Sequence, residues 1–324
     1  MLSTRAVRAG RAIVGLLATG LVGFIAWQLV EDLLARRAIA AHNRTSRAYA
    51  ARLLERIGTV PPELSESSGL AVSRSQPGVL WSHNDSGDGP NLYAIDVTGR
   101  LLAIVPVMNA SAQDWEDLSL GPCPDVVSAG SSSCLYIADT GNNDRSREVL
   151  TIYVLVEPTI DRSGRRLAAV PARSFRFRYP GRTEDSEALA VRPSGDVTIV
   201  SKGRTGSIDF YGFSASMVSR AIASTQVIVA EYRGNTGIRP DQEIGRWVTG
   251  AAVSPDGMVL AVRTYNEVFF YRATDGAWQD LKRPCFLDDA EPQGEAIAYL
   301  DEDTLLLTSE EARGRRGTIH RLKC

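Results

Sequence analysis

One short pattern occurs five times along this chain of 324 residues. In each copy a small or acidic polar residue precedes a short apolar run with the composition of a β-strand, and a second such run follows across a turn. The copies occupy residues 66–73, 114–120, 185–191, 247–254 and 293–299. Repeats of roughly 40 to 50 residues cannot bury a core alone and must stack on one another. The sequence therefore predicts an all-β fold, a β-propeller.

Alternating apolar residues and turn residues assign five blades to residues 50–324. The fifth blade ends one strand short. Residues 52–60 are available to supply that strand, because a ring of sheets otherwise leaves an exposed edge. In this interpretation residues 225–230 form the outer strand of blade three. The long stretches at 144–183 and 204–246 leave six blades as the alternative.

The N-terminal region contains a run without charged residues at 12–30. It is long enough to cross about 30 Å of hydrocarbon at about 1.5 Å per residue. It predicts one transmembrane helix, with a short basic tail (1–11) before it and a stalk (31–49) after it. The alternative is a signal peptide cleaved after the small-residue triplet Ala38-Ile-Ala40, although the run is longer than a typical signal peptide requires.

The four cysteines bear on the compartment of the large domain. Cys123 and Cys134 flank a short polar loop between two predicted strands, which suits a disulfide. The sequence leaves open whether Cys285 and Cys324 also pair, and four buried thiols are the alternative. Because disulfides persist in oxidising compartments, we expect a single-pass cell-membrane protein whose propeller lies outside the cytoplasm.

Charge and histidine content exclude two classes of function. The formal net charge is only −2, so the chain lacks the basic field expected of a nucleic-acid-binding protein. It has three histidines, of which only His83 falls near the predicted axis, and a tri-histidine zinc site is therefore excluded.

Aligning the repeats brings five residues to one position at the start of the innermost strands, namely Ser68, Glu116, Glu187, Thr249 and Glu295. Two positions earlier the repeats carry Glu66, Asp114, Asp185, Trp247 and Gln293. Innermost strands line the central channel of a propeller, so these side chains are expected to converge at one mouth. Converging carboxylates need compensation, either from calcium or from Lys202 and Arg263. The alternative is a polar plug that only sets the register of the blades.

The motifs GLAVS…VLWSHNDSGDGPNLYAIDVTGR, DWEDL…CLYIADTGNN, EDSEALAV and QGEAIA resemble those of the phytase-like and esterase-like extracytoplasmic propellers of bacteria. They are more distantly similar to the calcium-dependent, gluconolactonase-type lactonases, which are usually six-bladed. That resemblance implies a divalent ion held by Glu116 or Glu187 together with Asp139 and Asn142. With Glu295 from the aligned repeats, these are the predicted metal ligands.

Two classes of function fit these residues. The first, which we rank ahead, is a membrane-tethered domain that binds a small molecule or an envelope protein at a calcium-containing mouth. The second is a metal-dependent hydrolase of phosphoesters, esters or lactones. The hydrolase would use Glu187 or Glu116 as general base and Lys202 or Arg263 to hold an anionic substrate.

Overall fold

The computed structural model describes residues 53–128, 133–242, 245–274, 276–287 and 290–324. The predicted basic tail, transmembrane helix and stalk therefore lie outside the described residues. Within the described part of the chain, no helix is both long enough and apolar enough to span a membrane. Contacts divide the chain into the units Met1–Ala48 and Tyr49–Cys324, and every element below belongs to the second unit.

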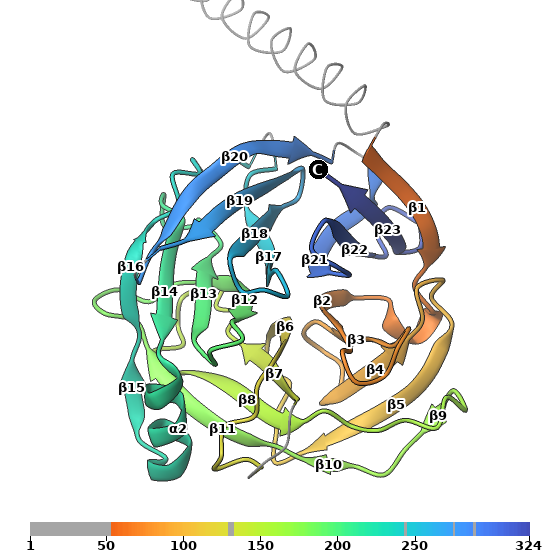
Figure 1. Cartoon of the computed structure of the whole chain (residues 1–324), viewed down its shortest axis with the longest axis horizontal. Helices are drawn as coiled ribbons and strands as arrows, with labels where there is room; N and C mark the ends of the chain where they lie inside the picture. The colour runs from red at the N-terminus through yellow and green to blue at the C-terminus, as the bar shows by residue number, and fades with distance from the viewer. Residues whose placement is uncertain (1–52, 129–132, 243–244, 275, 288–289) are drawn as a thin grey trace, which may run out of the picture. The chain divides into compact units, whose positions relative to one another are not determined.

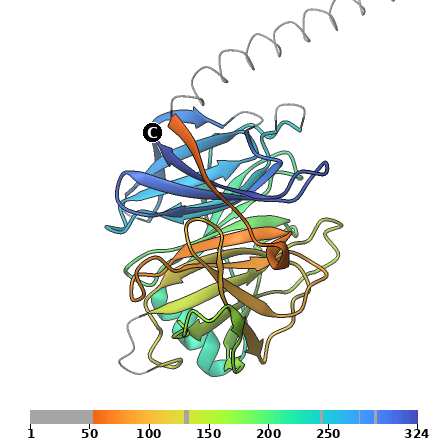
Figure 2. The ribbon, with the colours of Figure 1, turned by 90° about the vertical axis from the view of Figure 1, so that its right-hand side faces the viewer.

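The second unit is a ring of five antiparallel sheets around a central axis, so the five-bladed propeller is confirmed (Figure 1). The innermost strands of neighbouring blades contact one another around the whole ring, and the fifth contacts the first. Turned by 90°, the ring is seen from its side, with the N-terminal strand beside the strands that end the chain (Figure 2). Since the ring closes within this unit, its core needs no residue before Tyr49.

The first three blades are built from strands in the following order from the axis outward. Blade one contains β2 (Ser67–Val72), β3 (Leu80–Asn84), β4 (Asn91–Ile95) and β5 (Leu101–Met108), with β9 (Arg165–Arg166) and β10 (Val170–Pro171) added in parallel to β5. Blade two contains β6 (Trp115–Gly121), β7 (Cys134–Asp139), β8 (Leu150–Val156), β11 (Arg173–Arg178) and β15 (Val227–Val229). Blade three contains β12 (Ser186–Val191), β13 (Val197–Ser201), β14 (Asp209–Phe213) and β16 (Glu231–Asn235).

The last two blades follow the same order. Blade four contains β17 (Val248–Val253), β18 (Val259–Thr264), β19 (Glu267–Ala273) and β20 (Trp278–Phe286). Blade five contains β21 (Gln293–Tyr299), β22 (Thr304–Glu310), β23 (Thr318–Lys323) and β1 (Leu54–Thr59). A short 3₁₀ helix, η1 (Pro62–Leu64), leads from β1 into blade one.

The two long stretches that left room for a sixth blade contain other elements. The first supplies β9 and β10 to the edge of blade one. The second contains helix α2 (Ala215–Ser224), which begins at the capping hydroxyl of Ser214 and buries Val218, Ala221 and Ile222. These three residues pack into the core between blades two and three, so the helix extends that core and forms no new blade.

The predicted outer strand of blade three is wrong. Residues 225–230 contain β15, which pairs in parallel with β11 and therefore extends blade two. The outer strand of blade three is β16, antiparallel to β14. The physical reason is α2, which packs against the blade-two side of the core and ends at Thr225 in the left-handed conformation, so the following residues run along β11.

Both ends of the unit take part in closing the ring. The N-terminal strand β1 pairs antiparallel with β23 and is the outermost strand of blade five. The last residue, Cys324, forms a disulfide with Cys285 at the outer strand of blade four, with the two Cα atoms 6.3 Å apart. Blade five is therefore held by backbone hydrogen bonds on one side and by a covalent link on the other.

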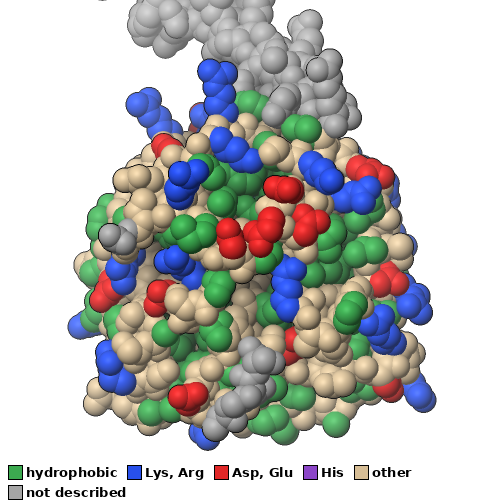
Figure 3. Space-filling view, viewed as in Figure 1, with side chains coloured by type: hydrophobic (Ala, Val, Ile, Leu, Met, Phe, Trp, Pro, Cys, Tyr) green, Lys and Arg blue, Asp and Glu red, His purple; other side chains and the backbone are tan. Residues whose placement is uncertain are grey.

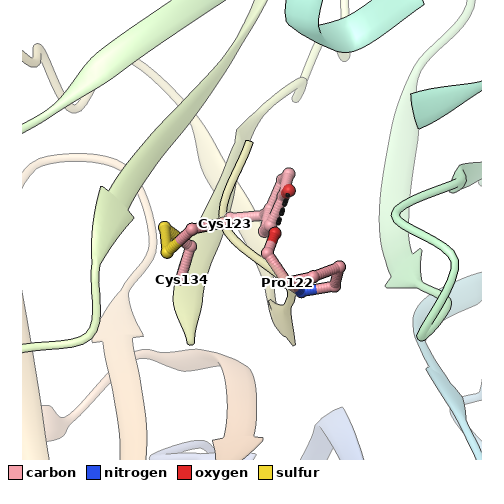
Figure 4. Close-up of a disulfide and its surroundings, with 4 residues drawn as sticks. Pro122, Cys123 and Cys134 are labelled. Atoms are coloured by element: carbon pink, nitrogen blue, oxygen red, sulfur yellow. Dashed lines mark hydrogen bonds between the residues drawn. A yellow bond between two sulfur atoms is a disulfide. The ribbon is translucent and has the colours of Figure 1, made fainter. Parts of the chain in front are cut away.

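The second disulfide, predicted from the sequence, joins Cys123 to Cys134 with the Cα atoms 4.9 Å apart. It connects the end of β6 to the start of β7 beside Pro122 (Figure 4). The hydroxyl of Tyr136 donates a hydrogen bond of 2.7 Å to the carbonyl oxygen of Pro122. The connection between these strands is thus fixed at its base, and all four cysteines of the chain are paired.

The hydrophobic core is divided into five layers, each between two neighbouring blades. Trp81 and Trp115 are fully buried in the layer between blades one and two. On the face shown in Figure 3, acidic and basic side chains are interspersed with hydrophobic ones. The small net charge thus results from opposite charges that nearly cancel.

Candidate functional site

Each innermost strand contains a β-bulge at the same position. The register with the second strand shifts at Ser68, Glu116, Glu187, Thr249 and Glu295. A bulge inserts one residue without a partner and re-aims its side chain. The residues that the sequence repeats bring together therefore share one structural position, at the end of the axis where the innermost strands begin.

The two bulges with hydroxyl side chains connect neighbouring blades. Ser68 Oγ donates a hydrogen bond of 2.6 Å to the carbonyl oxygen of Glu116, and Thr249 Oγ1 donates one of 2.9 Å to that of Glu295. These hydroxyls have a structural role. Among the five bulge residues, only Glu116, Glu187 and Glu295 carry carboxylates that could bind a ligand or a metal ion.

Two groups of carboxylates are close enough to hold a metal ion. In the first group, Asp85, Asp114 and Glu116 each offer an oxygen within 4.8 Å of the others. In the second group, Glu116, Asp185 and Glu187 do the same. Glu116 belongs to both groups, so the five residues form one continuous acidic mouth. We call these the Asp85 group and the Asp185 group.

The Asp185 group is compensated by basic side chains. Lys202 forms an ion pair with Glu187, and both residues are buried. Arg204 Nε donates a hydrogen bond of 2.7 Å to Asp185 Oδ2, and the backbone N–H of Asn142 donates one of 2.8 Å to Oδ1. Two positive charges thus face the two carboxylates that distinguish this group.

Among the described residues, no basic side chain forms an ion pair with the Asp85 group, although the charge of Lys202 partly offsets the raised pKa of Glu116 and of Asp85, and the charge of Arg147 partly offsets that of Asp114. Glu116 is 3% exposed, and its carboxylate has neither a hydrogen bond nor an ion pair there. Asp114 likewise forms no ion pair with a basic side chain, and Asp85 accepts only the N–H of Ser86, at 2.5 Å. Burial raises the pKa of Glu116 well above its usual range, and the charge on Asp85 raises it further. Burial, followed by the charge on Asp85, raises the pKa of Asp114 to about 6.

Gly141 allows the Asp85 group to assemble. A Cβ atom at this position would lie 2.1 Å from Glu116 Oε1 and 2.3 Å from Asp114 Oδ2. Both distances are far shorter than a non-bonded contact, and the φ angle of Gly141 is not among the positive ones. The absence of a side chain, rather than backbone freedom, is therefore what the site requires here.

The predicted ligands Asp139 and Asn142 lie beside the mouth and are already engaged. Asp139 Oδ1 accepts a hydrogen bond of 2.8 Å from the guanidinium of Arg147. The side-chain amide of Asn142 donates to the carbonyl oxygens of Arg147 and Glu184, and its oxygen accepts the N–H of Arg147. Both residues hold the loop that follows β7.

The predicted residue Arg263 is fully buried between blades four and five. Its guanidinium donates to the carbonyl oxygens of Ala296 (2.7 Å) and Thr308 (3.1 Å) and forms an ion pair with Glu291. Arg263 therefore connects two blades. Of the two predicted cations, Lys202 is the one that pairs with a carboxylate of the mouth.

The predicted ligand Glu295 forms a pair with Glu310. The side-chain amide of Gln293 donates to Glu295 Oε1 at 2.9 Å and to Glu310 Oε2 at 2.6 Å. Burial raises the pKa of Glu295 to about 7. Burial and then the charge on Glu295 raise the pKa of Glu310 to about 9. This pair can therefore hold a proton at neutral pH.

Asp117, which sequence reasoning did not identify, closes the channel below the mouth. Its carboxylate accepts backbone N–H groups from three blades, those of Leu118 (2.8 Å), Leu189 (2.7 Å) and Ala251 (3.2 Å). The side chain is fully buried. Asp117 is thus a polar plug of the kind that the sequence left as an alternative, but it lies one residue after the bulge, and the mouth exists in addition to it.

Sequence reasoning placed Asp114 and Asp185 among the side chains that converge at the mouth, but it did not count them, or Asp85, among the predicted metal ligands. The signal was present, because Asp114 and Asp185 occupy the repeat position two residues before the bulge, and Asp85 follows the second strand of blade one. The repeat does not contain the loop geometry, and loop geometry decides which acidic positions come within 4.8 Å of one another.

Fold and site together define a five-bladed propeller with an acidic axial mouth. No protein-family model and no curated protein matches the sequence. Similar solved structures include the PQQ-bound form of an aldose sugar dehydrogenase from Streptomyces coelicolor, at 13% identity over 83% of this chain and 97% of that chain, with a TM-score of 0.46. Another is a luciferin-regenerating enzyme, at 12% identity over 84% and 95% of the two chains, with a TM-score of 0.43.

Proposed function

We propose that this protein is a ligand-binding propeller whose axial mouth holds a calcium ion on Asp85, Asp114 and Glu116. The observation that carries the proposal is the crowding of these three carboxylates within 4.8 Å without an ion-pair partner among the described residues. Such an arrangement is costly unless a cation compensates it. Calcium suits the site because it binds six to eight oxygen ligands in flexible geometry.

The ion would leave coordination positions for an external ligand. Three carboxylates supply at most six oxygens, and the mouth lies at the open end of the axis, because Asp117 closes the channel below it. A molecule bearing a carboxylate or phosphate group would bind to the ion directly. The proposed role is therefore recognition of a small anionic molecule or of an acidic group on an envelope protein.

We propose further that the propeller lies outside the cytoplasm, anchored by the N-terminal apolar run. The two disulfides support an oxidising compartment, since such bonds are rare in reducing ones. Protease treatment of intact cells should remove the propeller and leave the anchor. Protection of the propeller in intact cells, with digestion after lysis, would contradict this topology.

Calcium binding is tested by thermal unfolding of the unit Tyr49–Cys324 in chelator and in millimolar calcium. A calcium concentration about 100-fold above Kd should raise the free energy of unfolding by about 2.7 kcal/mol. The variant Glu116→Gln should lose this increase, whereas Glu148→Gln, which removes an exposed carboxylate, should keep it. Equal stability of the wild-type unit with and without calcium would contradict calcium binding and would favour a purely structural role for the mouth.

A metal-dependent hydrolase is the second candidate, favoured by one observation. Glu295, with a pKa raised by burial to about 7, has the proton affinity that a general base needs near neutral pH. Phosphomonoesters, phytate, aryl esters and lactones should be assayed with calcium present. Turnover that is lost in Glu295→Gln and kept in the exposed control Glu148→Gln would favour the hydrolase over binding, and an inert, calcium-loaded protein would favour binding.

A further inference from the structure

A second hollow lies at the opposite end of the axis. It has a volume of about 510 Å³ and is lined by one stretch from every innermost strand. These stretches follow the bulge position in their strands, whereas Glu116 and Glu187 stand at it and Asp114 and Asp185 stand before it. The Asp117 carboxylate lies between the two and closes the channel. We call this hollow the apolar cavity.

The lining of the apolar cavity differs chemically from the acidic mouth. Aliphatic and aromatic residues make most of its wall, among them Leu70, Val72, Leu118, Val191, Val253 and Tyr299. No carboxylate contributes to the described wall. Small-molecule sites are typically apolar hollows of roughly 300 to 1,000 Å³ with a few placed polar groups. Size and lining therefore fit a small, largely apolar molecule.

One charged residue, Arg74, lines the cavity. Its guanidinium donates to the carbonyl oxygens of Leu300 (2.9 Å) and Tyr299 (2.8 Å), which are neutral acceptors. Among the described residues no carboxylate forms an ion pair with Arg74, although Glu302 and Asp301 are near enough to favour its charge. Arg74 is exposed, so its guanidinium can be reached from solvent at the edge of the cavity. An anionic group at this edge would complement it.

The wall of the cavity is held in place before any ligand arrives. Gly121, Pro122 and Ser133 line it where β6 connects to β7. The disulfide between Cys123 and Cys134 ties this connection together. A preformed wall reduces the ordering cost of binding, so a small ligand can bind without reorganising the ring.

We propose that the apolar cavity binds a small amphipathic anion, a monocarboxylic acid whose aromatic or aliphatic body fills the hollow and whose charged group meets Arg74. The two ends of the axis would then select different ligands, a cation at one and an apolar anion at the other. This inference does not depend on calcium binding, because the cavity shares no lining residue with the mouth.

The test uses two fluorescent probes that differ by one anionic group. Anilinonaphthalene sulfonate is an apolar anion, and N-phenyl-1-naphthylamine is its neutral counterpart. Titrated into the unit Tyr49–Cys324, the anionic probe should bind at one site and be displaced by decanoate but not by decyltrimethylammonium. Arg74→Gln should weaken the affinity for the anionic probe roughly tenfold, which is the effect of one charged hydrogen bond. The affinity for the neutral probe should stay unchanged.

Variants that fill the cavity complete the test. Val253→Trp and, independently, Leu120→Trp should abolish binding of both probes, with folding checked by circular dichroism. Tyr232→Ser removes an exposed aromatic residue away from the cavity and should change nothing. Each titration is repeated with calcium and with chelator, and equal affinities are expected. Absence of binding to the folded wild-type unit, or equal loss of both probes in Arg74→Gln, would overturn the proposal.

Discussion

The two carboxylate groups at the mouth have nearly the same composition but differ in how many of their carboxylates form ion pairs. In the Asp185 group, Lys202 pairs with Glu187 and Arg204 with Asp185, so two of its three carboxylates have an ion-pair partner within the protein. In the Asp85 group, Asp114 and Glu116 have no ion-pair partner among the described residues. A repeat thus supplies carboxylates to several blades, and the local basic residues decide which of them are structural and which remain available to a ligand.

The largest expected effect comes from breaking the compensated group. Lys202→Met would leave Glu187 buried and unpaired, and removing one partner of a buried ion pair costs about 3–5 kcal/mol. Denaturant unfolding should therefore show a large loss of stability. The double variant Lys202→Met/Glu187→Gln should recover most of it. If Lys202→Met is as stable as the wild type, the ion pair between Lys202 and Glu187 does not compensate the Asp185 group as we describe.

Gly141→Ala is expected mainly to weaken the affinity of the Asp85 group for calcium. The new Cβ would displace Glu116 and Asp114, and changes next to metal ligands typically cost about 10–100-fold in affinity. Gly89→Ala is the matched control, because its Cβ would approach only the end of the Asn91 side chain, at 3.2 Å, which can shift by a few tenths of an ångström. Unchanged calcium affinity in Gly141→Ala would show that the ion binds elsewhere.

A smaller effect is expected from pH. The pKa values of Asp114, Glu295 and Glu310 are raised, to about 6, 7 and 9. An acid whose pKa is higher in the folded state stabilises the fold at low pH, and this contribution is lost as the pH rises through the folded value. In calcium-free buffer, stability should therefore fall from pH 5.5 to 8.5, while the stabilisation by calcium should grow. Denaturant unfolding at both pH values, with and without calcium, measures both trends.

The fold could be predicted from the sequence because its determinants repeat. The five bulge positions follow from the aligned motifs, and the fifth blade is visibly one strand short. The outer strand of blade three could not be predicted, since its place depends on α2, a tertiary feature that occurs in one blade and that no repeat signals. A repeat therefore predicts what the blades share and not what distinguishes one blade from the others.

The site was predictable in part for the same reason. Glu116 and Glu187 stand at a repeated position and belong to the two carboxylate groups. The surroundings of Arg263 were not predictable, because its burial against Glu291 depends on residues 28 positions apart that meet between two blades. Asp117 gave no signal either, since its three hydrogen-bond donors are backbone N–H groups, which every sequence contains.

The central claim is that the Asp85 group, and not the Asp185 group, holds a calcium ion. Isothermal titration of calcium into the unit Tyr49–Cys324 tests it most directly, with Asp114→Asn compared with the double variant Lys202→Met/Glu187→Gln. We expect one calcium per wild-type chain, no binding in Asp114→Asn, and retained binding in the double variant. Calcium binding that survives in Asp114→Asn and disappears in the double variant would contradict the claim.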